Sequence, residues 1–179
     1  MSSGKGAFEL LLELDQSSSR SREIAEQQLL SAGHFQYVRF RVAECYLMVK
    51  VISVSEILPL PPVTLVPFTK PWVIGVSNIR GDVIPISDFS HFLFEQGIDK
   101  NKKNKVIILK GVGFNTAILV DEVLGMSDVV LDDIDSDTSG TEEQLKPYII
   151  GTVTRDEQTY SVMDSKALLT EPGFMKAAV

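Results

Sequence analysis

The spacing of apolar and polar residues predicts a chain built mainly from short β-strands. Over residues 35–43 the apolar Val38, Phe40 and Val42 alternate with polar residues, which is typical of a half-buried strand. Short apolar runs bounded by turn-forming residues predict further strands over residues 46–54, 72–76, 83–86, 106–110, 116–120, 148–153 and 159–162. This order of strands, tight turns and few helices favours a mainly β fold.

Both ends of the chain are predicted to lie outside the strands. Residues 8–14 and 21–32 carry apolar side chains at helical spacing, and Gly33 is well placed to end the second helix. We expect this extension, residues 1–34, to pack on the main domain; docking on a partner is the alternative. A short helix is predicted over residues 165–169, and residues 171–179 are expected to form a loose tail.

The stretch over residues 72–94 organises the rest of the chain. Gly81 can adopt a positive φ without steric cost, so Arg80 is expected to stand at an exposed turn between two strands. Pro85 has no amide donor, which predicts an edge or bulged strand. Asp88 is a good N-cap and predicts a short helix immediately after it. Prolines farther upstream predict an irregular surface segment over residues 58–62.

This stretch also carries a family resemblance. Residues 75–89 read Gly-Val-Ser-Asn-Ile-Arg-Gly-Asp-Val-Ile-Pro-Ile-Ser-Asp-Phe, which resembles the signature of CheW-like domains, the coupling modules of bacterial chemosensory arrays. Residues 52–57 and 118–123 resemble two further segments of that family, and the likeness extends over residues 37–169. The sequence departs from the pattern by Ile79 and Phe89 in place of leucine, and by an acidic insertion around residues 132–143.

The resemblance implies a fold. It implies two SH3-like five-stranded β-barrels that share an interface core, intertwined within residues 35–170 and divided near residues 95–105. Strands from the chain ends are expected to complete barrels that begin elsewhere in the sequence. Barrels of this kind leave grooves in which apolar strand faces meet partner proteins.

The resemblance also implies a function, that of a non-enzymatic adaptor without cofactor or metal. The regulatory domain of a CheA-like histidine kinase would dock on one barrel, and the tip of a methyl-accepting chemoreceptor would bind between the barrels. In the family, the positions of Glu56 and Arg80 lie close together and contribute to partner contacts. The residues expected to make these contacts are Val54, Glu56, Ile57, Asn78, Arg80 and Gly81.

The N-terminal extension refines the expected pathway. The apolar and acidic run over residues 8–14, ahead of a long extension, resembles the couplers that serve type IV pilus twitching motility. A coupler of flagellar chemotaxis is the first alternative. A pilus assembly protein that uses no kinase is the second.

Composition excludes several classes of partner. The net charge of −7 argues against nucleic acid and against direct insertion into anionic membranes. The single cysteine, Cys45, excludes an internal disulfide and a multi-thiolate metal site. The first apolar run is broken by Glu9, Glu13 and Asp15, so neither a signal peptide nor a membrane span is expected. We therefore expect a cytoplasmic protein that is recruited to membrane-associated receptor arrays.

Two patterns that suggest chemistry have simpler explanations. Ser87, Asp88, Ser90 and His91 superficially offer a nucleophile, a base and an orienting group, but no glycine-flanked serine elbow is present and Asp88 is better explained as a helix cap. The acidic stretch over residues 128–143 invites comparison with a calcium-binding EF-hand loop, whose pattern requires Gly and Glu where Thr138 and Gln144 stand. A solvated, mobile loop is expected there instead.

Overall fold

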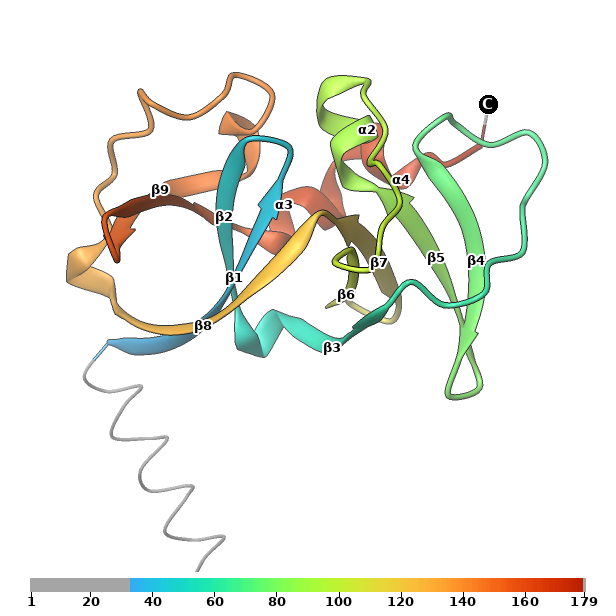
Figure 1. The fold of residues 1–179 in the computed structure, drawn as a ribbon, viewed down its shortest axis with the longest axis horizontal. Coiled ribbons are helices and arrows are strands. Elements are labelled where there is room, and N and C mark those ends of the chain that lie inside the picture. Colours follow the sequence, from blue (N-terminus) through green and yellow to red (C-terminus); the bar gives the residue numbers. More distant parts are fainter. Residues whose placement is uncertain (1–32, 179) are drawn as a thin grey trace, which may run out of the picture.

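A computed structural model of the protein describes residues 33–178 (Figure 1). The helices expected within residues 8–32 lie outside the described residues. The mainly β fold is confirmed, because the described part contains ten strands in two five-stranded sheets. The first sheet has the order β8 (Glu122–Val130), β1 (His34–Val42), β2 (Cys45–Lys50), β10 (Gln158–Met163), β9 (Ile149–Arg155). The second has the order β3 (Val54–Pro59), β6 (Lys105–Lys110), β7 (Asn115–Val120), β5 (Asp82–Asp88), β4 (Val73–Ile79).

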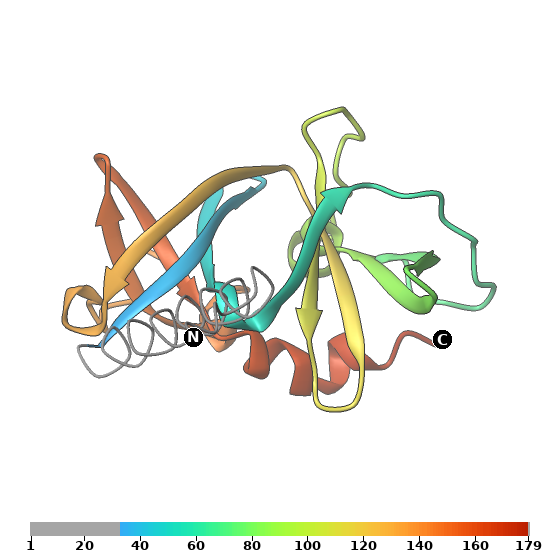
Figure 2. The ribbon, with the colours of Figure 1, turned by 90° about the horizontal axis from the view of Figure 1, so that it is seen from below.

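The chain changes from one sheet to the other at two places. A 3₁₀ turn, η1 (Val51–Ser53), interrupts the strand expected over residues 46–54 and carries the chain from β2 into β3. The chain returns at Asp121, between β7 and β8. Residues 95–105, where a division was expected, connect the helix after β5 to β6 within the second sheet. The second barrel is therefore built from the consecutive strands β3 to β7, whereas the first combines strands that are distant in sequence, as Figure 2 shows.

The two sheets repeat one topology. In each, an antiparallel hairpin, β1–β2 or β6–β7, has its second strand paired in parallel with the second strand of another hairpin, β9–β10 or β4–β5. In both halves the second strand of this other hairpin, β10 or β5, leads to an aspartate that caps a short helix. Asp88 caps α2 (Phe89–Phe94) and Asp164 caps α3 (Ser165–Thr170). One supersecondary unit is thus used twice.

Three apolar clusters fill the structure. One lies inside each barrel: Ile84, Ile86 and Leu119 belong to the second barrel's cluster, and Tyr37 and Val162 to the first's. The largest lies between the sheets and joins them. It includes Val38, Phe40, Leu47 and Val49 from the first sheet and Ile107, Leu109, Ile118 and Val120 from the second. Because both sheets contribute fully buried side chains to this central core, the barrels form one folding unit.

Pro85 lies in an interior strand, so the expectation of an edge strand is wrong. β5 lies between β7 and β4, and the register shift occurs in β4, between Val73 and Gly75. The parallel pairing with β7 covers only Ile86 to Asp88. The missing amide of Pro85 is tolerated there because the proline lies just before that pairing begins. The irregular segment likewise starts later than expected, since β3 continues to Pro59.

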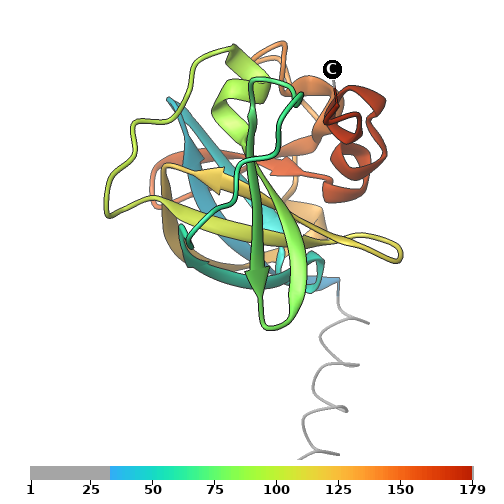
Figure 3. The same ribbon diagram turned by 90° about the vertical axis from the view of Figure 1, so that its right-hand side faces the viewer.

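The C-terminal residues are folded, so the expectation of a loose tail is wrong. α4 (Pro172–Met175) carries Phe174, which is buried in the central core. The ring of Phe174 meets that of Phe92 edge-on at 5.0 Å, and Phe92 in turn contacts Trp72. Beyond the helix, the amide of Lys70 donates to the carbonyl of Ala177 at 2.7 Å. Figure 3 shows this segment beside β4 and α2.

Asp88 confirms its predicted role as a helix cap and also supports the following loop. One carboxylate oxygen accepts the amide of His91 at 2.9 Å, and the other accepts the amide of Ile98 at 2.9 Å. Both oxygens are therefore occupied by backbone donors, and the side chain is buried. This arrangement explains the aspartate without catalysis.

Replacing Asp88 with alanine is expected to lower the free energy of unfolding by about 3 kcal/mol, because two amides lose a charged acceptor. The matched control is Asp164→Ala in the other half. Asp164 accepts only the amide of Lys166 and is only partly buried, so about 1 kcal/mol is expected there. Urea denaturation measures both. Equal losses would contradict the double role of Asp88.

Candidate functional site

The candidate site lies where the two edges of the second sheet meet. Glu56 lies on β3 and Arg80 in the turn between β4 and β5, and β3 and β4 are opposite edges of the sheet. Nevertheless the Arg80 guanidinium lies 3.0 Å from the Glu56 carboxylate. The sheet must curl for these edges to approach. The ion pair therefore spans the seam of the barrel.

The turn holds Arg80 in an unusual conformation. Arg80 has a φ of 55° and Gly81 a φ of 95°, both in the left-handed region. The side-chain oxygen of Asn78 accepts the amide of Gly81 at 2.9 Å, which fixes the turn from its own strand. Non-glycine residues rarely adopt this conformation, and such backbone strain is concentrated at functional sites. Asn78 and Gly81 are thus the residues that present Arg80.

The pair remains accessible to a partner. The side chain of Arg80 is 79% exposed and that of Glu56 is 29% exposed. An ion pair this exposed adds only about 0–1 kcal/mol to stability. A guanidinium presents five donors in a planar fork, so Arg80 keeps donors free for a partner carboxylate. The geometry thus favours recognition over stabilisation.

Val54 and Ile57 form the apolar base of the site. Both are partly buried and pack against the central core, although their odd spacing along one strand would ordinarily place them on opposite faces. A register shift in the β3–β6 pairing between Val54 and Glu56 reverses the alternation, so both side chains reach the same cluster. The structure therefore brings Glu56, Asn78, Arg80 and Gly81 together, and it packs Val54 and Ile57 of the same strand as Glu56 against the central core.

The sequence did not reveal an apolar surface beside this turn. Val83, the second residue of β5, is 68% exposed. Val83 pairs with Asn78 across the β4–β5 hairpin and so lies next to the turn that carries Arg80. The run Val83-Ile84-Pro85-Ile86 contains no polar residue, so no alternation marks which face is exposed. Exposed apolar residues beside an exposed arginine are typical of protein-binding surfaces.

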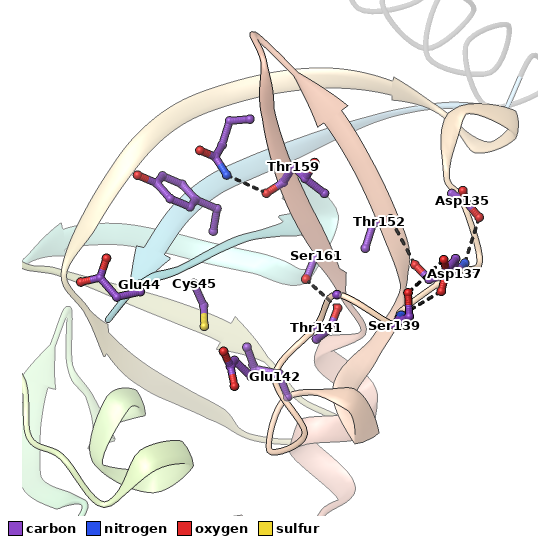
Figure 4. A pocket seen from close by; sticks show the side chains of 14 residues that line it. Glu44, Cys45, Asp135, Asp137, Ser139, Thr141, Glu142, Thr152, Thr159 and Ser161 are labelled. Atoms are coloured by element: carbon purple, nitrogen blue, oxygen red, sulfur yellow. Dashed lines mark hydrogen bonds between the residues drawn. The ribbon is translucent and has the colours of Figure 1, made fainter.

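A recess on the first barrel is lined in part by carboxylates. Figure 4 shows this cavity of about 380 Å³, which Glu44, Asp135, Asp137 and Glu142 line together with Cys45. The acidic stretch that was expected to be a mobile loop folds over the first sheet here, since Asp135 pairs with Thr152 of β9 and Leu145 is buried. This acidic stretch thus forms a wall of the first barrel.

Several acidic residues of this wall have partners in the protein. Asp133 lies 2.7 Å from the guanidinium of Arg155, and the carboxylate of Asp137 accepts the amide of Ser139 at 2.8 Å. That amide and the Ser139 hydroxyl hold the pKa of Asp137 below its ordinary value. Within residues 33–178, no group of three or more His, Cys, Asp or Glu side chains is arranged to hold a metal ion.

Cys45 is expected to react slowly with alkylating reagents near neutral pH. Burial, followed by the negative charges of Glu142 and Glu44, raises the pKa of the thiol. Because the reactive form is the thiolate, the rate with iodoacetamide should rise only at a pH above the ordinary thiol pKa. Unfolding in urea should accelerate the reaction at a pH of about 7.5.

The same raised pKa links Cys45 to stability. Its contribution is fully present below the unfolded-state pKa and is lost as the pH rises through the folded-state pKa. Glu142→Gln should lower the thiol pKa and speed alkylation of the folded protein. An unchanged pH profile of the alkylation rate would contradict this assignment.

The sequence and the fold both match known proteins. Residues 36–173 match the CheW-like domain. Over 179 residues, covering 100% of both chains, the sequence is 30% identical to protein PilI of Pseudomonas aeruginosa. It is 26% identical over 145 residues to a probable chemotaxis protein CheW of Rhizobium etli, covering 79% of this chain and 92% of that one.

The fold is similar to a solved scaffolding protein. The crystal structure of TtCheW from Thermoanaerobacter tengcongensis superposes with a TM-score of 0.69 at 21% identity, covering 78% of this chain and 94% of that one. This likeness confirms the pair of barrels that the family resemblance implied. None of the helices in the described part is long and apolar enough to cross a membrane.

Proposed function

The chain belongs to the CheW-like domain family of scaffold proteins, and from this membership we propose that it couples a chemoreceptor to a CheA-like histidine kinase. The observation that carries the proposal is the exposed Glu56–Arg80 pair at the seam of the second barrel. It is an accessible, oriented charge on a rigid base, and it adds little to stability. Such a group is suited to docking a partner protein.

We propose that the second barrel binds the regulatory domain of the kinase. Arg80 exchanges the Glu56 carboxylate for one on the kinase, and Asn78 and Gly81 keep the turn in place during the exchange. Val83 supplies apolar area beside the charge. The tip of a methyl-accepting chemoreceptor binds between the barrels, where Val54 and Ile57 lie against the central core. The adaptor works in the cytoplasm at membrane-associated arrays.

The pathway we propose is control of type IV pilus twitching motility. Support comes from the 30% identity to protein PilI over the full length of both chains. The matches to chemotaxis proteins CheW favour flagellar chemotaxis as the second candidate. Deleting the gene separates the two, because loss of twitching with normal swimming is expected. Loss of swimming alone would support the second candidate.

Reconstitution tests the coupling directly. The full chain, the cognate kinase and a receptor signalling fragment are combined, and kinase autophosphorylation is followed. We expect receptor control of the kinase to require the chain. Kinase activity that responds to the receptor equally well without the chain would overturn the proposal. Omitting the receptor provides the control for direct activation of the kinase.

A further inference from the structure

A loop far from the candidate site exposes large apolar side chains. In the segment before β4, Leu65 is 81% exposed and Phe68 is 86% exposed, and Val66 between them is exposed as well. In Figure 1 this segment lies at the outer end of the second barrel, beyond β4. Three exposed large apolar residues within one short loop form a patch, and patches of this kind mark interaction surfaces.

The backbone of Phe68 adds a second unfavourable feature. Its φ is 58°, in the left-handed region that favours glycine and asparagine. An aromatic residue there strains the backbone, and its exposed ring gains almost no burial in return. Both features cost stability in the isolated chain, so neither is explained by folding. An observed strain of this kind points to a contact that the ring makes with another molecule.

The loop is continuous with the C-terminal segment, and together they form a basic surface. The amide of Lys70 donates to the carbonyl of Ala177, and Thr69 pairs with Ala178. Met175 is also exposed. Lys70 and Lys176 are the only charged side chains in residues 63–72 and 172–178. In a chain with a net charge of −7, the charged side chains of these two segments are both positive, and the carboxylate of Glu171 just before α4 is occupied by the amide of Gly173.

The sequence contains a segment of complementary chemistry. Residues 8–15 read Phe-Glu-Leu-Leu-Leu-Glu-Leu-Asp, which combines five large apolar side chains with three carboxylates and no base. β1, which follows this segment in the chain, begins at the opposite end of the molecule from the loop (Figure 1). Residues 8–15 of a neighbouring molecule can therefore reach the loop of this one, whereas the chain's own segment would have to run along the whole molecule to do so.

We propose that the surface formed by Leu65, Val66, Phe68, Lys70, Met175 and Lys176 binds residues 8–15 of a second copy of this chain. Phe68 and Leu65 contact the apolar side chains of the segment, and the two lysines face its carboxylates. Each copy carries both halves of the contact, so association runs head to tail. This surface is separate from the proposed kinase site at Arg80.

Sedimentation velocity of the full chain tests the proposal. Wild type is expected to associate as its concentration rises towards about 500 μM. The association should be weak, because a contact between one loop surface and one short segment buries little area. Phe68→Asn removes the ring and suits the left-handed backbone, so it should weaken association at least about tenfold without lowering the melting temperature. Val112→Asn, which removes an exposed apolar side chain elsewhere, is the matched control and should leave association unchanged.

Charge reversal makes the test specific to the segment. Variant K70E/K176E and variant E9K/E13K should each sediment as monomers, because each carries like charges on both halves of the contact. Mixing the two variants should restore association. A monomeric wild type over the whole concentration range would overturn the proposal. So would association that persists in Phe68→Asn, or a mixture of the two charge variants that remains monomeric.

Discussion

Replacing Arg80 with glutamate is expected to weaken binding of the cognate kinase regulatory domain at least about 30-fold, which corresponds to about 2 kcal/mol. The substitution places a carboxylate where the proposed partner presents one, and it leaves Glu56 without its cation. Because the Arg80 side chain is 79% exposed, the free energy of unfolding should change by less than about 1 kcal/mol. Calorimetric titration and urea denaturation measure the two quantities separately.

Two further variants decide what Arg80 does. The exchanged pair Glu56→Arg with Arg80→Glu restores an ion pair across the seam but presents the wrong charge to a partner. It should bind as poorly as Arg80→Glu alone. Arg155→Glu, which breaks an ion pair on the first barrel, is the control and should bind normally. Unchanged affinity of Arg80→Glu, or full recovery in the exchanged pair, would contradict a direct role in binding.

Replacing Gly75 with alanine is expected to lower the free energy of unfolding by more than about 3 kcal/mol. Gly75 lies on β4, where the amide of Val76 donates to the carbonyl of Thr64 at 2.9 Å and so covers the edge of the sheet. A Cβ at position 75 would overlap the Thr64 carbonyl and lie 2.7 Å from a Val63 methyl. Its φ of 144° adds strain for any side chain.

The internal repeat supplies a parallel case and a control. Gly151 on β9 lies against the carbonyl of Asp135, which covers the other barrel in the same way, so Gly151→Ala should be similarly costly. Gly113 has a φ of 79°, but a Cβ added there would meet no atom within 4 Å, so Gly113→Ala should cost only about 1 kcal/mol. Equal losses at positions 75 and 113 in thermal or urea unfolding would show that backbone conformation, and not edge closure, governs Gly75.

Local patterns predicted eight of the ten strands, because period-two alternation and turn residues are short-range signals. They missed β3, which was not separated from the strand before it, and β8, whose end lies in the stretch that was expected to be a mobile loop. The hairpin over β6 and β7 and the capping of α2 by Asp88 followed from neighbouring residues alone. The strand expected over residues 46–54 was placed too far along the chain because η1 is largely apolar, so the composition does not mark the change of sheet. Pairing β1 with β8 requires contacts across a long stretch of sequence, and no local pattern records it.

The candidate site was predictable only in part. The turn residues Asn78 and Gly81 and the charge of Arg80 stand out in the sequence, and the family resemblance supplied their expected relation to Glu56. The closure of the barrel, which brings β3 to the turn after β4, depends on sheet curvature and so required the structure. Exposure of Val83 and Phe68 was likewise hidden, because an apolar residue at a surface position looks the same in sequence as one in the core.

Calorimetric titration of the full wild-type chain with the regulatory domain of the histidine kinase encoded nearest its gene tests the coupling function most directly. Saturable binding at one site per kinase domain is predicted. Absence of heat and of complex formation at concentrations up to about 100 μM, with both proteins folded, would contradict kinase coupling through the second barrel.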